Sequence, residues 1–398
     1  MILRRHGAFY ASCLAAFTAG HIVNYAVILY AQEAIGSDLL AGIGFGLCFG
    51  PPLVLGWVAG AWCDRYPPTR LIHGAQALFV VAALLLWAAD RAGADESSMR
   101  VALLVAAALL AGAGWSFVAP ARMATLGQIA RADELKPATV AFNLFVMLGF
   151  GLGPLVLALA RSAAGWSGVF ATAALLFIAA SFALLAVRTR ASGRAHAPLS
   201  AEIGEGIAAV AARPLLAQLM LAAMAGYLAM GPMTVLLPKL AATQLRLSEL
   251  QRGAFLGALA LALIGGGLLA LALQRRLHHG RTILVATALA GAGLAALGAV
   301  RDARAAVALL GAVGVAGGLA LSLIVANIQA AAPDALRGRI VAMYTIVSQI
   351  VPAASGVAAG ALLQGWGVGI ALHACGAALV IAMAAAALRM TVLRRHAG

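Results

Sequence analysis

Long apolar runs, separated by short breaks that hold charges or prolines, recur along the whole chain. A helix needs about 20 consecutive apolar residues to cross the hydrocarbon core of a bilayer, whereas a membrane strand needs about 10 that alternate with polar residues. The runs in this chain are continuous and have the length that a helix needs. Because only 10% of the residues are charged, against roughly a quarter in soluble domains, we predict an all-α integral membrane protein.

These runs predict twelve membrane-spanning helices. Their approximate ranges are 9–31, 39–62, 71–89, 101–121, 139–160, 168–187, 215–237, 253–273, 282–300, 305–331, 340–364 and 366–388. The first run is longer than the apolar part of a signal peptide and lacks a clear small-residue cleavage site. We therefore interpret it as the first span.

Most of the 27 Lys and Arg residues fall on the same side of the membrane as the N-terminus when the chain crosses twelve times. Positively charged loops are retained in the cytoplasm. The distribution therefore predicts a multi-pass protein of the bacterial cytoplasmic (inner) membrane with both termini in the cytoplasm. It also explains the net charge of +14 without a nucleic-acid partner.

The long polar stretch 188–213 predicts a cytoplasmic linker with a short amphipathic helix. It separates an N-terminal six-helix bundle, residues 1–187, from a C-terminal six-helix bundle, residues 214–398. Two pairs of segments support this duplication, because the turn at 56–70 has a weaker copy at 265–281 and the segment 133–141 aligns with 334–342. We therefore predict one six-helix unit that is used twice.

The turn between the second and third spans contains Gly60-x-x-x-Asp64-Arg65 and continues to Arg70. With the two six-helix halves and the central linker, it resembles the signature loop of the major facilitator superfamily. The resemblance implies a cytoplasmic gate in which charged residues at helix ends form ion pairs. Its implied residues are Gly60, Asp64, Arg65, Arg70, Asp133, Arg337 and Arg339. Pro67-Pro68 stands where the family usually has a glycine after the arginine.

Short pieces elsewhere are similar to the branch of this superfamily that contains the enterobactin exporter and related transmembrane secretion effectors. They are Pro120-Ala121-Arg122, Asp133-Glu134-Leu135, Leu236-Leu237-Pro238 and the run 333–339. In the fifth span, Gly149, Gly153 and Pro154 resemble a motif of the exporting branches, with close glycine packing as the alternative interpretation. The resemblance implies proton-coupled export of a small molecule by alternating access.

In this span assignment every Lys, Arg, Asp and Glu falls in a loop or at a helix end, so a proton pathway through the spans needs another titratable group. His21 lies in the middle of the first span and shares a helical face with Thr18 and Tyr25. Because histidine titrates near neutral pH, His21 is the candidate for proton coupling. The alternative is a neutral histidine that is hydrogen-bonded in the core. Glu33, near the outer end of the same span, is the weaker candidate.

Uncharged polar and aromatic residues recur in the spans that would line a central cavity. Amides and phenols in lipid need partners and tend to point inward. The cavity candidates are Asn24, Tyr25, Trp115, Asn143, Tyr227, Asn327, Gln329, Tyr344 and Gln349. Hydrogen bonding between helices is the alternative for each of them. A mixed aromatic and amide lining suits a moderately polar, aromatic small molecule better than a sugar or an inorganic ion.

These features predict a secondary transporter that exports a small organic molecule, with a siderophore of the enterobactin type as the leading class. A multidrug or lysolipid transporter of the same fold is one alternative, and a non-transporting membrane sensor or scaffold is another. We expect no enzyme activity, no cofactor and no metal, because no nucleophile-base pair, metal cluster or phosphate loop is evident. We expect a monomer whose partners are the substrate, protons and the lipid bilayer.

Overall fold

The computed structural model describes residues 5–93, 96–131, 133–191, 204, 207–333 and 336–397. Within its helices, the side chains at positions 57, 60, 61, 64, 136, 337–339 and 342 are outside this description. The described residues form helices joined by short turns, with no β-strand among them. Of the expected linker, residues 192–203, 205 and 206 lie outside the described ranges, and residues 207–211 are helical. The chain divides into two compact units.

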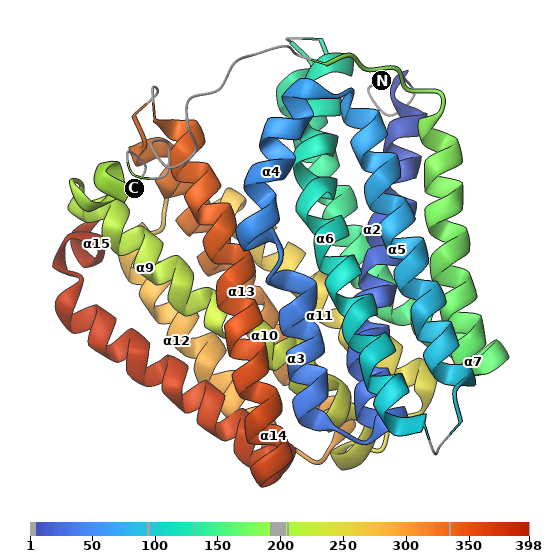
Figure 1. The fold of residues 1–398 in the computed structure, drawn as a ribbon. Helices are drawn as coiled ribbons and strands as arrows, with labels where there is room; N and C mark the ends of the chain where they lie inside the picture. The colour runs from blue at the N-terminus through green and yellow to red at the C-terminus, as the bar shows by residue number, and fades with distance from the viewer. Residues whose placement is uncertain are drawn as a thin grey trace. The chain divides into compact units, whose positions relative to one another are not determined.

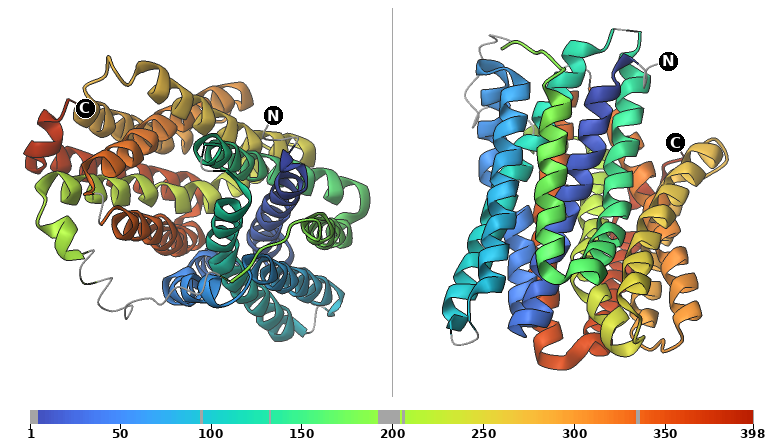
Figure 2. Two further views of the ribbon diagram at one scale, coloured as in Figure 1. Left: turned by 90° about the horizontal axis from the view of Figure 1, so that it is seen from above. Right: turned by 90° about the vertical axis from the view of Figure 1, so that its right-hand side faces the viewer.

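The first unit comprises Met1–His196 and Ser248–Gly257. Its helices are α2 (Gly7–Tyr30), the π-helical turn η1 (Ala31–Ile35), α3 (Asp38–Phe49), α4 (Pro52–Arg65), α5 (Pro68–Arg91), α6 (Ser97–Ile129), α7 (Leu135–Leu184) and the first turns of α11 (Glu249–Leu273) (Figure 1). Helix α2 is the core of this unit. Nearly all of its residues from Phe9 onward are buried, and the helix lies between the two halves of α7 (Figure 2, right).

The second unit comprises Ala197–Leu247 and Ala258–Gly398. Its helices are α9 (Pro214–Leu228), α10 (Met230–Lys239), the π-helical turn η3 (Leu240–Gln244), the rest of α11, α12 (His279–Leu297), α13 (Ala303–Ala331), α14 (Arg337–Arg389) and the short α15 (Thr391–Arg395). Helix α14 packs on α9, α10 and α12, while α15 packs on α9 and α12. The C-terminal helix is therefore part of the folded unit.

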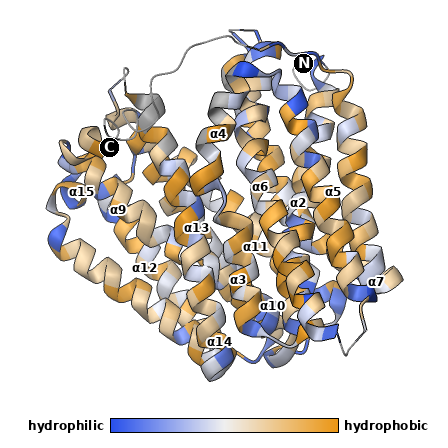
Figure 3. Ribbon diagram, in the orientation of Figure 1, coloured by the Kyte–Doolittle hydropathy of each residue, from blue (hydrophilic) through white to orange (hydrophobic). Residues whose placement is uncertain are grey.

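Ten helices in the described ranges are long and apolar enough to cross a membrane. In each unit, hydrophobic residues cover most of the length of the long helices and hydrophilic residues gather toward their ends (Figure 3). Two of the ten, Pro137–Leu184 and Met343–Arg389, have 48 and 47 residues. The backbone is non-helical at Gly165 in the first and at Gly367 in the second. Both glycines have positive φ, 61° and 76°, a conformation that costs other residues energy.

The structure differs from the sequence prediction at the end of the fourth span. We expected this span to end near residue 121, so that Arg122 would lie in the following loop. Helix α6 instead continues through Pro120 to Ile129. Proline is tolerated inside a membrane helix when neighbouring groups satisfy the backbone carbonyl that it leaves free. Arg122 is therefore a residue of a helix interior, and the expectation that all charges lie in loops or at helix ends does not hold for it.

Candidate functional site

A fully buried arginine lies between α2 and α6 in the first unit. Arg122 has no exposed surface, and its Nη1 donates to Sγ of Cys13 at 3.1 Å. Its Nη2 contacts the carbonyl and the hydroxyl oxygen of Ser12, each at 3.2 Å. The guanidinium carbon lies 5.6 Å from the centre of the Phe17 ring. All of these partners are neutral dipoles or a π face.

The charge of Arg122 is not balanced by a carboxylate among the described residues. Its Nε is buried and has no acceptor. Taking an ion out of water costs several kcal/mol even after relaxation, and a neutral neighbourhood returns only part of that cost. An ionisable group that a membrane protein keeps at such a cost is by default a functional candidate. Sequence reasoning missed Arg122 because it treated every charge as a boundary between spans.

His21 lies in α2, beyond the Ser12 and Cys13 that contact Arg122, and aromatic side chains surround it. Its ring centre is 5.3 Å from that of Trp115 in α6 and 5.0 Å from that of Phe150 in α7. Trp115 is also stacked on Phe17 at 6.1 Å. The aromatic rings therefore run without interruption from Arg122 to His21. The contacts of the imidazole among the described residues are aromatic. Its role in proton coupling stays a prediction.

The glycines of the export-type motif in α7 face α2 beside these residues. A Cβ atom at Gly149 would lie 2.4 Å from Cβ of Phe17, and one at Gly153 would lie 2.6 Å from Cβ of His21. Distances this short do not occur between real Cβ atoms. The two glycines thus let α7 pack directly on the face of α2 that carries His21. Pro154 follows them inside α7.

Two of the cavity candidates in the first unit form a hydrogen-bonded pair. The indole Nε1 of Trp115 donates to Oδ1 of Asn24 at 3.1 Å, while Nδ2 of Asn24 is buried without an acceptor in the described structure. Tyr25 is 2% exposed. Asn143 is exposed on α7 and does not join this group. Asn24 and His21 therefore both contact Trp115.

Glu33 belongs to a network of four charges at the end of the first unit opposite the N-terminus. Its Oε2 is 2.5 Å from Nη1 of Arg161, and its Oε1 is 3.4 Å from Nη1 of Arg252. Glu249 lies 3.8 Å from Arg161 and 3.4 Å from Arg252. Arg161 also stacks on Trp166, 4.1 Å from its ring centre. The structure thus gives Glu33 ion-pair partners from α7 and α11, which lie far from it in sequence.

The opposite end of this unit holds the described part of the expected gate. Arg65, Arg70 and Asp133 are exposed. The side chains of Gly60, Asp64, Arg337 and Arg339 lie outside the described residues.

An ion pair at this end comes from the neighbour of Asp133. Nη1 of Arg5 is 2.6 Å from Oε1 of Glu134, and Nε2 of His6 is 3.8 Å from Oε2 of Glu134. Partial burial acts to raise the pKa of Glu134, but the hydrogen bond and charge of Arg5 outweigh it and hold this pKa below its usual range. Glu134 is therefore the carboxylate that ties the N-terminal residues to the start of α7.

In the second unit, two cavity candidates contact each other. The phenol oxygens of Tyr227 and Tyr344 are 2.6 Å apart, and Ser348 makes a further hydrogen bond to Tyr227. Gln349 has a buried Oε1 without a partner in the described structure, and Gln329 is exposed. Asn327 lies elsewhere, near the end of α13, where it bonds to His279 and His396. Within this unit, Asn327 therefore does not join the pair of Tyr227 and Tyr344.

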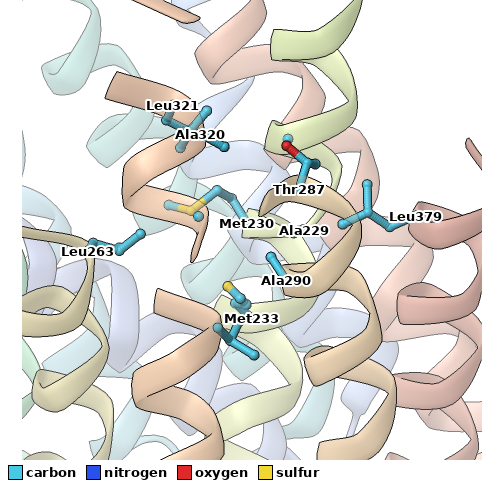
Figure 4. Close-up of a pocket in the computed structure, with 12 residues that line it drawn as sticks. Ala229, Met230, Met233, Leu263, Thr287, Ala290, Ala320, Leu321 and Leu379 are labelled. Carbon is cyan, nitrogen blue, oxygen red and sulfur yellow. The ribbon is translucent and has the colours of Figure 1, made fainter. Parts of the chain in front are cut away.

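A pocket with almost entirely apolar walls lies within the second unit (Figure 4). Its cavity is small, about 20 Å³, which is little more than one water molecule needs. Its walls come from α9 to α14 and are formed by Gly226, Ala229, Met230, Met233, Leu263, Thr287, Ala290, Val313, Gly317, Ala320, Leu321 and Leu379. None of the nine predicted cavity residues lines it. The two methionines can adapt their shape to an apolar guest.

The sequence model of the Major Facilitator Superfamily matches residues 8–356, which is most of the chain. A search of curated proteins found no sequence that matches this chain.

Solved transporters have a similar fold. A POT family transporter in complex with 5-aminolevulinic acid is 13% identical, with a TM-score of 0.78, and the match covers 98% of this chain and 96% of that one. A bacterial homologue of the human lysosomal transporter Spinster, inward-facing and unoccupied, is 15% identical, with a TM-score of 0.73 and coverage of 99% and 97%. A D-xylose-proton symporter is 15% identical, with a TM-score of 0.73 and coverage of 98% for both chains. At such identities the likeness concerns the fold alone.

Proposed function

The chain belongs to the major facilitator superfamily, whose members are membrane transporters and not enzymes, and we propose that it is a secondary exporter of a small organic molecule. Its two halves, residues 1–187 and 214–398, would act as six-helix bundles that alternate around a central site. The breaks at Gly165 and Gly367 support twelve spans, because each divides a helix that is long enough for two crossings. The Lys and Arg distribution supports cytoplasmic termini.

The uncompensated charge of Arg122 is the observation that carries this proposal. A bundle that only needed packing would be served by an apolar residue at this position, at no cost of desolvation. We assign Arg122 the role of meeting an anionic group of the substrate, such as a carboxylate or a catecholate. The buried Nε and the two terminal nitrogens offer donors that an anion would accept better than a thiol or a hydroxyl. Because Arg122 has no exposed surface in this structure, it would contact the substrate in another stage of the transport cycle.

Export and proton coupling are supported by the contact between α7 and α2. The glycines that resemble the motif of exporting branches pack on the segment that carries His21. A motion of α7 along α2 would therefore change the surroundings of the imidazole directly. His21 would bind a proton in one orientation of the bundles and lose it in the other. Glu33, held by two arginines, is the second candidate for this role.

A siderophore of the enterobactin type is the substrate class that we propose first. The test is a deletion strain grown under iron limitation, with its cytoplasm and medium analysed by mass spectrometry. Accumulation of an anionic siderophore in the cytoplasm, and its reappearance in the medium when the gene is restored, would support the proposal. A siderophore distribution identical to that of the parent strain would exclude this substrate class.

The apolar pocket in the second unit favours one alternative. Its twelve wall residues include only one with a polar side chain, Thr287, so a wider form of the pocket in another stage of the transport cycle would suit an acyl chain or a hydrophobic drug. A multidrug or lysolipid transporter of the same fold would use such a surface. Vesicles that hold the protein and transport a hydrophobic dye or a lysolipid, with no effect of a charge change at Arg122, would favour this alternative over an exporter of organic anions.

A further inference from the structure

The last residues of the chain fold back onto the second unit. In α15, Leu393 has no exposed surface, and its N–H donates to Oε1 of Gln218 in α9 at 2.7 Å. The N–H of Gly280, in the first turn of α12, donates to the carbonyl of His396 at 3.0 Å. The segment 391–397, called here the C-terminal latch, is therefore held by two helices. Its partners Gln218 and Gly280 lie more than a hundred positions earlier in the chain.

A shared asparagine joins the latch to a third helix. Nε2 of His396 lies 2.7 Å from Oδ1 of Asn327 in α13. Nδ2 of Asn327 lies 3.1 Å from Nδ1 of His279, and Nε2 of His279 lies 2.8 Å from the carbonyl of Gln274. That carbonyl can only accept, so Nε2 of His279 carries a proton and its Nδ1 is free to accept from the amide. All of these bonds are made at once when both histidines are neutral. A proton on Nδ1 of His279 would break its bond to Nδ2 of Asn327 and leave only a longer contact, 3.2 Å, to Oδ1, which Nε2 of His396 already contacts.

The contact between the latch and α12 has room only for glycine at position 280. A Cβ atom at position 280 would lie 1.6 Å from the carbonyl oxygen of Leu393 and 2.6 Å from its carbonyl carbon. Both atoms belong to the backbone, so a rotamer change cannot relieve the overlap. An alanine at this position would therefore displace the latch without altering a charge or a hydrogen-bonding side chain.

The surroundings of the two histidines are cationic. The ring centres of His279 and His396 are 6.2 Å apart, and His278 has a buried Nδ1 without a partner among the described residues. The cationic residues on the elements that pack here are Arg213 of α9, Arg275 and Arg276 after α11, Arg281 of α12, and Arg389, Arg394 and Arg395 of α14 and α15. Within the described part of the second unit the one carboxylate is Asp302, at the other end of α13. Among the described residues of this unit, a proton added here meets other cations and no nearby carboxylate.

We propose that the C-terminal latch is an acid-released switch, docked on α9, α12 and α13 while His396 is neutral and freed when it is protonated. The proposal concerns this segment alone and holds whatever the substrate is. Release would uncover Asn327, Gln218 and the first turn of α12 on the face that both termini are proposed to share with the cytoplasm. Acidification of that side, which proton-driven export itself produces, would then change the mobility of this end of the second unit.

The sign of the pH dependence follows from the docked state. Burial, followed by the proximity of His279 and His278, holds the pKa of His396 below its usual value. The released segment binds protons at the ordinary histidine pKa of about 6.5, so protons favour release. Docking is complete above this pH and weakens below it. Between pH 7.5 and 5.5, the titration of His396 can weaken docking by up to about tenfold.

Hydrogen exchange measured by mass spectrometry tests the proposal on the full-length protein in phosphatidylcholine nanodiscs. The readout is the protection of the peptide that spans residues 388–397, corrected for the intrinsic effect of pH on exchange. Protection should fall from pH 7.5 to 5.5, by up to about tenfold. A peptide from the middle of α12 serves as the internal control for unfolding and should not change.

Three variants separate the latch from a general effect of acid. Gly280→Ala should leave the segment unprotected at both pH values, whereas Gly311→Ala in α13, where a Cβ meets nothing within 4 Å, should behave as wild type. The double variant His279→Gln and His396→Gln keeps side chains that can hydrogen-bond but lacks the titratable groups, so its protection should not depend on pH. Equal protection of the wild type at both pH values, or full protection in Gly280→Ala, would overturn the proposal.

Discussion

Alanine at position 153 is expected to weaken the packing of α7 on α2, and the size of the effect follows from the distances at this contact. The new Cβ would lie 2.6 Å from Cβ of His21 and 3.3 Å from its carbonyl carbon, whereas ordinary contact begins at 3.4 Å. The first of these atoms is fixed to the backbone of a buried helix, so the helices themselves must separate. Such overpacking costs about 1–3 kcal/mol.

The intrinsic preference of the helix acts in the opposite direction. Alanine in a helix interior is favoured over glycine by about 1 kcal/mol. The variant Gly127→Ala in α6 measures this helix preference alone, because a Cβ at that position meets nothing within 4 Å. The net expectation is that Gly153→Ala loses up to about 2 kcal/mol while Gly127→Ala gains up to about 1 kcal/mol.

The assay is equilibrium unfolding of the purified protein in mixed micelles, titrated with a denaturing detergent and followed by tryptophan fluorescence. The informative quantity is the difference between the two alanine variants, which removes the effect of the detergent on the wild type. Equal stability of Gly153→Ala and Gly127→Ala would refute the reasoning that the motif glycines exist for close contact with α2. Gly149→Ala, with its Cβ 2.4 Å from that of Phe17, should follow Gly153→Ala.

Two further predictions concern coupling and the gate. His21→Gln should remove the dependence of export on the pH gradient at normal protein levels, and transport that still follows the gradient in this variant would rule His21 out as the coupling residue. Asp64→Asn should reduce transport more than Gln274→Ala, because the later copy of the turn lacks the acid that the gate is proposed to use; equal losses measured at equal protein levels would contradict this asymmetry.

The sequence was sufficient to predict the helical membrane fold because hydropathy is a sum over a segment. The ten candidate spans follow the apolar runs, and two of them are long helices with breaks at Gly165 and Gly367. Hydropathy summed over a segment does not predict whether a single charged side chain is buried or exposed. Arg122 was therefore taken for a boundary, whereas the structure buries it against Ser12 and Cys13 of α2.

The grouping of the polar residues could not be read from the chain for a different reason. Asn327 looked like a cavity residue because it is an amide in an apolar run, but its partners are His279 and His396, which are 48 and 69 positions away. Glu33 was named as a coupling candidate from its place in the first span alone, and its partner Arg252 is 219 positions away. Neither pairing leaves a periodic signal in the sequence, since each depends on which helix ends meet in the fold.

The central claim, that Arg122 recognises an anionic group of an exported molecule, is tested most directly by comparing what cells retain. A deletion strain would be complemented with the wild type, Arg122→Gln or Arg100→Gln, and the anionic compounds of cytoplasm and medium would be compared by mass spectrometry at equal protein levels. Arg100 lies in the same helix and bonds to Tyr30 and to the carbonyl of Ala34, so it is a matched control.

Loss of a hydrogen bond to a charged partner, about 1.5–3 kcal/mol, corresponds to roughly a tenfold to 150-fold weaker apparent affinity. We predict that the anions that accumulate in the deletion strain are cleared by the wild type and by Arg100→Gln and are retained by Arg122→Gln. Clearance of the same anions by Arg122→Gln at the wild-type rate would contradict the account.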